Sequence, residues 1–199
     1  MRILMIGNSF IYFNDMPRAL AELTGAEVET NLRGGADLAE RFEAGTPMAD
    51  DFAAKTANER YDYFVIQDHS RGPVERPERF FEGARKICET ARKCGAVPIF
   101  YATWGYQHPA LVAKEGTPEY KAAEEKYEKL YRGLYEAYHR AAEENGAIVA
   151  DVGKAFFESA DAAELFAEDN YHPGEKGSRL AAEVIAATIA ECERQKARG

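Results

Sequence analysis

Apolar residues gather in five short runs along the chain, and the segments between them repeat apolar positions with helical spacing. The runs lie at about residues 2–6, 26–30, 62–67, 96–101 and 147–151. The third and fourth runs are apolar without alternation, a pattern typical of strands that are covered by helices on both faces. The pattern therefore predicts five β-strands in a mostly parallel, buried sheet.

The segments between the runs predict the helices. Helical spacing occurs at residues 14–24, weakly at about 36–60, and clearly at about 77–94, 118–144 and 174–195. The longest of these has Thr117 as a predicted N-cap and Pro118 at its first position, and Asn145-Gly146 ends it. Its stripe of aromatic residues indicates packing against a core rather than a cofactor site.

A strand followed by a helix five times over favours a three-layer α/β domain. The chain of 199 residues contains no internal repeat, no low-complexity tract and no obvious linker. We therefore expect one domain over residues 1–199.

Composition narrows the partners that we expect. With 34 acidic and 25 basic residues the formal net charge is −9, which disfavours nucleic-acid binding, because that binding depends on basic residues that neutralise phosphates. Three cysteines, Cys88, Cys94 and Cys192, are too few for a disulfide framework and indicate a reducing compartment. We expect no membrane association, since no apolar stretch reaches the ~18 residues that a span requires. A cytoplasmic location is expected unless a signal peptide has been removed. Nothing in the sequence indicates an oligomeric state.

Two segments far apart in the chain supply the residue types of a nucleophilic hydrolase. Ser9 comes directly after the first predicted strand, and Asp169 and His172 precede the last predicted helix. A serine hydroxyl needs a base within hydrogen-bond reach, and that base needs a carboxylate to orient it. We therefore predict that Ser9, Asp169 and His172 are catalytic. Taken singly, Ser9 would also suit a turn or a helix cap, and the Asp–His pair would suit an exposed loop.

Two further segments could complete such a site. Gly34 and Gly35 follow the second strand, and a residue without a side chain lets a backbone N–H approach a developing oxyanion. An ordinary strand-to-helix turn would have the same composition. Gln67 follows the third strand and could donate its side-chain amide to the same oxyanion. The adjacent Asp-His-Ser at 68–70 is not expected to act as a second triad, because neighbours in sequence rarely point at one another.

The segment from Trp104 to Gly116 follows the fourth strand, where α/β folds place loops that contact ligands. We predict that Trp104 and His108 shape the acyl or alcohol pocket, and a packed aromatic loop is the alternative. His139 stands alone within a predicted helix and is expected to be surface or core filling.

Read in order, four segments resemble the four sequence blocks of the SGNH (GDSL-type) hydrolase superfamily. They are Ile-Gly-Asn-Ser-Phe at 6–10, Gly-Gly-Ala-Asp-Leu at 34–38, Val-Ile-Gln-Asp-His-Ser at 65–70, and the Asp-x-x-His at 169–172. Segments 14–17 and 172–180 also resemble one branch of that superfamily, which has a Gly-Asn-Ser-Phe first block. The likeness spans nearly the whole chain. Two departures are Gln67, where an asparagine usually stands, and Ile11, where a threonine is common.

The resemblance implies a flavodoxin-like α/β/α sandwich and ester hydrolysis through an acyl-serine. Ser9 would be the nucleophile and would also donate its N–H to the oxyanion hole, with Gly35 and Gln67 as further donors. His172 would be the base and Asp169 the residue that orients it. Neither a metal nor another cofactor is expected.

We therefore expect a serine esterase that removes a small acyl group such as acetyl from a carbohydrate or another polar alcohol, so its partner is a small-molecule ester. Acyl transfer to an acceptor other than water would use the same residues. A binding module that has lost the chemistry is a further alternative, which an intact set of Ser9, Asp169 and His172 disfavours. A nucleotide-binding protein is the weakest alternative, because the first loop contains no G-x-G-x-x-G pattern.

Overall fold

The computed structural model describes residues 1–198, and its centre is a five-stranded sheet in which every neighbouring pair of strands is parallel. The strands follow one another in the order β2-β1-β3-β4-β5, which is the flavodoxin-like order. Their bounds are Arg2–Gly7 (β1), Glu27–Leu32 (β2), Tyr63–Ile66 (β3), Val97–Tyr101 (β4) and Ile148–Ala150 (β5). All five predicted strands are present.

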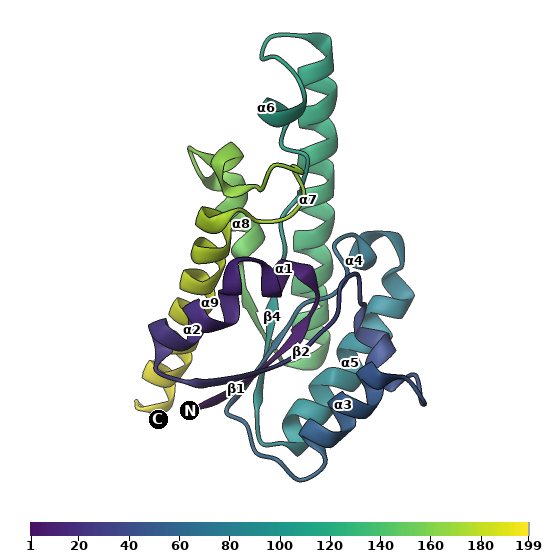
Figure 1. Cartoon of the computed structure of the whole chain (residues 1–199), viewed down its shortest axis with the longest axis vertical. Helices are drawn as coiled ribbons and strands as arrows, with labels where there is room; N and C mark the ends of the chain where they lie inside the picture. The colour runs from purple at the N-terminus through teal and green to yellow at the C-terminus, as the bar shows by residue number, and fades with distance from the viewer. Residues whose placement is uncertain (199) are drawn as a thin grey trace.

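Helices cover both faces of the sheet (Figure 1). Helices α2, α8 and α9 contribute to the core on one face, and α3, α5 and α7 contribute to the core on the other. The α-helices are Ser9–Tyr12 (α1), Met16–Thr24 (α2), Pro47–Thr56 (α3), Gly72–Glu75 (α4), Pro77–Lys93 (α5), Pro109–Val112 (α6), Pro118–Asn145 (α7), Val152–Glu158 (α8) and Glu175–Lys196 (α9), with short 3-10 helices at Phe13–Asp15 (η1), Leu38–Phe42 (η2) and Ala162–Leu165 (η3). The predicted three-layer α/β/α architecture is confirmed.

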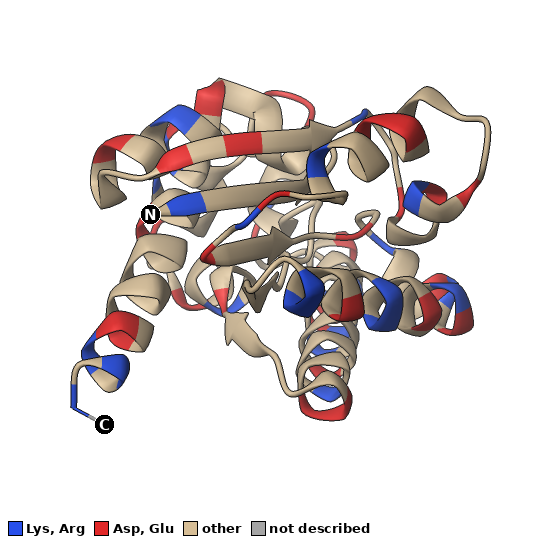
Figure 2. Cartoon of the chain, turned by 90° about the horizontal axis from the view of Figure 1, so that it is seen from below, with Lys and Arg blue, Asp and Glu red and all other residues tan. Residues whose placement is uncertain are grey.

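The central strand β1 shows why the apolar runs lack alternation. Its side chains point to opposite faces in turn, so Ile3 and Met5 belong to one core and Leu4 and Ile6 to the other. All four are 0% exposed. Charged residues lie mainly on the helices, the loops and the outer strand β2 (Figure 2). A strand buried on both faces has no position for a polar side chain, and the sequence pattern reflects this.

Several short elements differ from the predictions. The weak pattern at 36–60 forms two elements, η2 and α3, and Thr46 caps the second by accepting a hydrogen bond from the Ala49 N–H. Helices α1, α4, α6 and α8 are not predicted, because none exceeds seven residues and so none shows a full helical repeat. Within residues 1–198, no helix combines the length and the apolar composition needed to cross a membrane.

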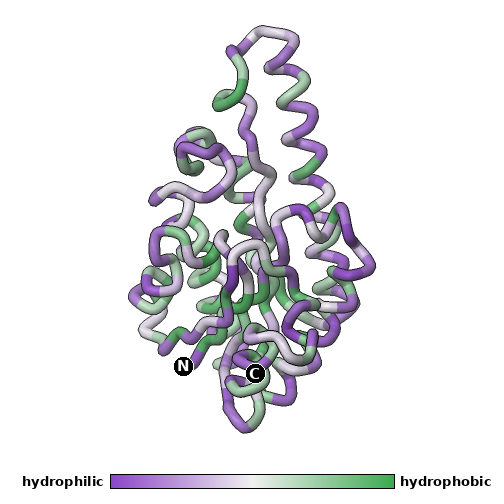
Figure 3. The backbone as a smooth tube through the Cα atoms, turned by 45° about the vertical axis from the view of Figure 1, so that its right-hand side comes forward, coloured by the Kyte–Doolittle hydropathy of each residue, from purple (hydrophilic) through white to green (hydrophobic). Residues whose placement is uncertain are grey.

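Helix α7 extends well beyond the sheet at the end where the strands terminate, with the short helix α6 beside its upper turns (Figure 1). The extended part is largely hydrophilic, in contrast to the apolar strands (Figure 3). Thr117 caps α7 by accepting a hydrogen bond from the Tyr120 N–H at 3.2 Å, and Gly146 ends it in a left-handed conformation with φ of 53°. Both predicted ends of this helix therefore agree with the structure to within a residue.

Candidate active site

The parallel sheet brings the predicted site segments to a single edge. Because all five strands run in the same direction, the segments that follow them emerge at their common carboxyl ends. The residues singled out after β1, β2, β3 and β4 are Ser9, Gly35, Gln67 and Trp104. Helix α1 lies above the sheet at this edge (Figure 1).

Ser9 is the first residue of α1 and is 9% exposed. The preceding Asn8 caps the helix, since its side-chain oxygen accepts a hydrogen bond from the Phe10 N–H at 3.2 Å. The first N–H groups of a helix have no hydrogen-bond partner within the helix. The Asn8 side chain accepts from the Phe10 N–H and not from the Ser9 N–H, so it leaves the Ser9 N–H available to another acceptor.

The loop between η3 and α9 presents the acid and the base. The Asp169 Oδ2 lies 2.6 Å from the His172 Nδ1, and the Asp169 Oδ1 accepts hydrogen bonds from the backbone N–H groups of Tyr171 and His172 at 3.0 and 2.9 Å. On the other side of the ring, the His172 Nε2 lies 2.9 Å from the Ser9 Oγ. The structure thus joins Ser9, His172 and Asp169, which come from opposite ends of the chain, into one hydrogen-bonded series.

Aromatic side chains fix the plane of the His172 ring. Phe13 stacks on it with the ring centroids 4.1 Å apart and the planes 2° from parallel. Phe10 and Tyr171 approach it edge-on at 5.7 and 4.7 Å. Packing and the Asp169 contact together orient the Nε2 toward Ser9.

Asp169 is in the ionised form that would stabilise a protonated imidazole. Burial alone would raise the pKa of this carboxyl. The hydrogen bonds from the His172 ring and from two backbone N–H groups outweigh that effect and hold the pKa below its ordinary value. A carboxylate whose lowered pKa favours the ionised form suits the role of an orienting residue beside the Nδ1.

The turn after β2 lies next to Ser9. The Ala36 N–H donates to the Arg33 carbonyl at 3.1 Å, and Gly35 adopts a left-handed φ of 68°, which favours glycine. The Asn8 side-chain amide donates to the Ala36 carbonyl at 3.1 Å. This hydrogen bond holds Asn8, which precedes Ser9, against Ala36, which follows Gly35. Gly35 itself is exposed.

In overall structure the chain matches a protein from Slackia heliotrinireducens that is provisionally named an SGNH hydrolase. The two sequences are 39% identical over 95% of this chain and 98% of that chain, with a TM-score of 0.83. The chain belongs to the SGNH hydrolase family. The family resemblance inferred from the four sequence blocks is therefore confirmed.

More distant structures share the fold of this SGNH hydrolase. A DUF4886 family protein from Bacteroides uniformis is 18% identical, with a TM-score of 0.69 over 96% of this chain and 83% of that chain. A member of the lipolytic protein G-D-S-L family from Veillonella parvula is 15% identical, with a TM-score of 0.62 over 96% and 98% of the two chains. No family model and no curated protein sequence matches the chain.

In this SGNH hydrolase, Gln67 has buried hydrogen-bond partners beside Ser9, and its predicted donation to an oxyanion stays a prediction. Gln67 is 0% exposed; its Oε1 accepts a hydrogen bond from the Asn8 N–H at 3.1 Å, and its Nε2 donates to the Asp68 carbonyl. Its amide holds the backbone that leads into Ser9. A side chain at Gly7 would displace this amide, because a Cβ there would lie 2.4 Å from the Gln67 Oε1.

Trp104, which was predicted to shape the pocket, lies in the core of the structure. Trp104 is 0% exposed and is stacked between Phe10 at 4.5 Å and Phe156 at 4.3 Å. Its Nε1 donates to the Tyr171 carbonyl at 3.4 Å. Trp104 is therefore a core residue that supports the loop of His172.

His108 caps helix α6, and its hydrogen bond and nearest aromatic contact are with α6 and α7 rather than with Ser9. Its Nδ1 accepts a hydrogen bond from the Ala110 N–H at 3.3 Å at the start of α6, and its ring packs edge-on against Tyr127 at 5.1 Å. Burial lowers the pKa of His108 below its ordinary value. The packed aromatic loop, given above as the alternative, describes this segment better.

The Asp-His-Ser segment at 68–70 does not form a second triad. The Asp68 Oδ1 accepts a hydrogen bond from the Leu38 N–H at 2.7 Å, and the Ser70 Oγ accepts one from the Tyr171 hydroxyl. His139, which was expected only to fill space, pairs with an acid: its Nε2 lies 2.7 Å from the Asp151 Oδ1. Within residues 1–198, no three His, Cys, Asp or Glu side chains come together as metal ligands.

Sequence reasoning missed a buried polar network under the site. Arg41 is 2% exposed, and its Nη2 donates to the Gly7 carbonyl at 2.7 Å and to the Asn31 carbonyl at 3.1 Å. The Asn8 amide donates to the Asp68 carbonyl at 3.1 Å as well. The only sequence signal for this network was a glycine and an asparagine directly before the serine.

Asp68 gives this network a pH dependence. The carboxyl is 1% exposed, and burial raises its pKa to about 7, although hydrogen bonds from Leu38 and His69 and the charge of Arg41 act in the opposite direction. Between its ordinary pKa and about 7, the folded chain binds a proton that the unfolded chain releases. The free energy of unfolding should therefore fall as the pH rises through this window, by at most about 1.4 kcal/mol per pH unit.

Asp68→Asn should flatten that dependence, because the amide cannot ionise and can still accept the hydrogen bond from Leu38. Urea unfolding of both proteins at about pH 5 and about pH 8 measures the effect. An equal change in the free energy of unfolding between the two pH values in both proteins would contradict an ionisation at Asp68.

Proposed function

We propose that the chain is a serine esterase that removes a small acyl group, such as acetyl, from a carbohydrate or another polar alcohol through an acyl-serine intermediate. The observation that carries the proposal is the distance of 2.9 Å between the Ser9 Oγ and the His172 Nε2, with Asp169 2.6 Å behind the ring. A general base within this reach is what a serine requires to act as a nucleophile.

In the proposed reaction, the Ser9 Oγ attacks the ester carbonyl and His172 takes its proton. Asp169 stabilises the imidazolium that forms. The tetrahedral oxyanion accepts hydrogen bonds from the backbone N–H groups of Ser9 and Gly35. His172 then gives its proton to the departing alcohol, and a water molecule activated by His172 releases the acid and frees Ser9.

A small acyl group suits the surroundings of Ser9. Its hydroxyl lies on a residue that is only 9% exposed, and Phe13 and Tyr171 enclose the neighbouring His172. Aromatic side chains packed against the base on two sides favour a small group at the reacting carbonyl.

Trapping the intermediate tests this proposal. The chain is incubated with p-nitrophenyl acetate and quenched in acid, and mass spectrometry of its peptides should find an acetyl group on Ser9. Asp169→Asn serves as a second sample, in which slower deacylation should increase the acetylated fraction. Acetylation at other residues only would contradict the assignment of Ser9.

Adding an acceptor alcohol to the same reaction separates hydrolysis from acyl transfer. Free acetate should account for the p-nitrophenol released, with or without the acceptor. An acetylated acceptor formed at the expense of free acetate would replace the esterase by an acyltransferase that uses the same serine.

A further inference from the structure

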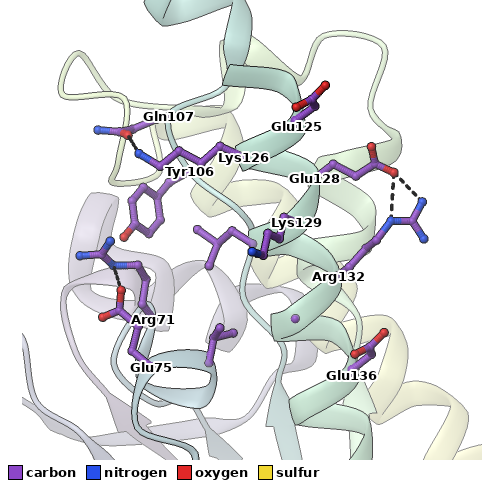
Figure 4. Close-up of a pocket in the computed structure, with 13 residues that line it drawn as sticks. Arg71, Glu75, Tyr106, Gln107, Glu125, Lys126, Glu128, Lys129, Arg132 and Glu136 are labelled. Atoms are coloured by element: carbon purple, nitrogen blue, oxygen red, sulfur yellow. Dashed lines mark hydrogen bonds and ion pairs between the residues drawn. The ribbon is translucent and has the colours of Figure 1, made fainter. Parts of the chain in front are cut away.

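A groove of about 720 Å³ lies between α7, α4 and the loop after β4, and the proposed mechanism does not use it. Its volume is in the range that holds a small molecule. Val74, Leu130 and Gly133 form an apolar part of its lining, and Tyr106 lies across from α7 (Figure 4). Val74 is 41% exposed, so an apolar surface is open to a ligand.

The groove adjoins the proposed site through a continuous row of aromatic rings. The Tyr171 ring lies edge-on to the His172 ring at 4.7 Å and edge-on to the Tyr106 ring at 4.6 Å. Tyr171 directly precedes His172. A substrate with its carbonyl at Ser9 could therefore extend over Tyr171 into the groove.

Four basic and four acidic residues line the groove, and two of the basic side chains extend toward its far wall. Lys126 and Lys129 extend from α7 toward Tyr106 and Arg71, whereas Glu128, Arg132 and Glu136 point away (Figure 4). Arg71 is paired with Glu75 through its Nε at 3.1 Å. Within residues 1–198, neither lysine lies within ion-pair distance of a carboxylate, and the Lys126 Nζ contacts only the Gln107 Oε1, at 3.4 Å.

The helical spacing of α7 places these features on one face. Lys126, Lys129, Leu130 and Gly133 are separated by three, four and seven residues, so they stand next to one another on the helix. Lys126 and Lys129 thus place two ammonium groups beside the apolar lining of the groove. They complement a ligand with an apolar body and a negative group.

We propose that this groove binds the alcohol part of the ester, and that this alcohol has an apolar face and an anionic substituent held by Lys126 and Lys129. The proposal rests on the proposed esterase function and specifies its substrate class. The apolar face packs over Val74, Leu130 and the Tyr106 ring. The anion, a carboxylate or a phosphate, lies between the two lysine side chains.

The test compares para-acetoxybenzoate with para-acetoxybenzamide, which differ in one negative charge, and uses p-nitrophenyl acetate as a reference ester. Wild type should show a higher kcat/KM for the carboxylate than for the amide. Lys129→Gln should reduce this preference by about twofold to fivefold, the upper part of the range for one exposed ion pair. Replacing both lysines should reduce it by about tenfold or more, and raising the salt concentration should have a similar effect. In both variants the kcat/KM for the carboxylate should also fall relative to that for p-nitrophenyl acetate.

Lys93→Gln is the matched control, because Lys93 is an exposed lysine at the end of α5, outside the groove, and its loss changes the net charge equally. An equal loss of preference in Lys93→Gln, or no preference in wild type, would overturn the proposal. An acetate ester that carries a phosphate in place of the carboxylate, para-acetoxyphenyl phosphate, shows which of the two anions is preferred.

Binding separates this proposal from the esterase itself. The Ser9→Ala variant should bind para-hydroxybenzoate more tightly than para-hydroxybenzamide. NMR titration measures both affinities, with chemical-shift changes expected at Tyr106 and Leu130. Lys126→Gln and Lys129→Gln in that background should remove the difference. Selective binding with no ester hydrolysis in wild type would refute the esterase function and support the anion-binding groove. Hydrolysis without selective binding would support the esterase function and refute the anion-binding groove.

Discussion

Replacing Ser9 with alanine is expected to lower kcat for p-nitrophenyl acetate by about a thousandfold or more. The Ser9 Oγ is the atom that His172 reaches at 2.9 Å, and alanine offers no atom to acylate. His172→Ala should cost a similar factor, because members of a triad act as a unit, and the double variant should be little worse than either single one. Steady-state kinetics on purified, folded proteins measure these effects.

Ser70→Ala is the informative comparison for Ser9→Ala. Ser70 is also buried and also lies after a strand at the same sheet edge, but its hydroxyl contacts Tyr171 rather than a histidine. It should retain most of the wild-type kcat. Near-wild-type turnover in Ser9→Ala, or an equal loss in Ser70→Ala, would show that the nucleophile has been misassigned.

Asp169→Asn should lower kcat by a factor no larger than that of His172→Ala. The amide can keep contact with the His172 Nδ1 but lacks the charge that stabilises the imidazolium. The low pKa of Asp169 means that wild-type activity should not fall through loss of this charge until the pH is below the ordinary range of an aspartate.

The fold was predictable because the strands carry their pattern in consecutive residues. Tyr63–Ile66 is buried at all four positions, and the continuous apolar run identified it without any knowledge of its neighbours. Helix α8, at Val152–Glu158, was not recognised because a seven-residue helix shows its apolar face only once or twice. Its packing against α7 and α9 defines it, and that packing is a tertiary property.

The residues joined at the site were recognised for a different reason. Ser9, Asp169 and His172 have side chains whose chemistry is complementary, and each follows or precedes a predicted element, so the parallel sheet had to bring the boundaries together. Gln67 and Trp104 also occupy the ends of strands. Position at a strand end does not determine whether a side chain points up into the site or down into the core.

Trp104→Ala is expected to destabilise the fold by about 3–5 kcal/mol, as is usual when a fully buried aromatic residue is removed. The ring is stacked between Phe10 and Phe156, and the stack supports the short helix that begins with Ser9. Trp104→Phe should cost less because it keeps the stacking and loses only the hydrogen bond to the Tyr171 carbonyl. Urea unfolding followed by circular dichroism measures both, with Val112→Ala, at a residue 50% exposed, as a control within about 0.5 kcal/mol of wild type.

The kinetic consequence of Trp104→Phe separates a core residue from a pocket residue. A tryptophan in contact with substrate would change KM and leave the free energy of unfolding nearly unchanged. A tryptophan beneath the site should change stability first and lower kcat through the loop that it supports, because Tyr171 directly precedes His172 and its carbonyl accepts the indole N–H. We expect the second result. A variant with wild-type stability and an altered KM would restore the pocket assignment and require the Trp104 side chain to reach the surface that Ser9 faces.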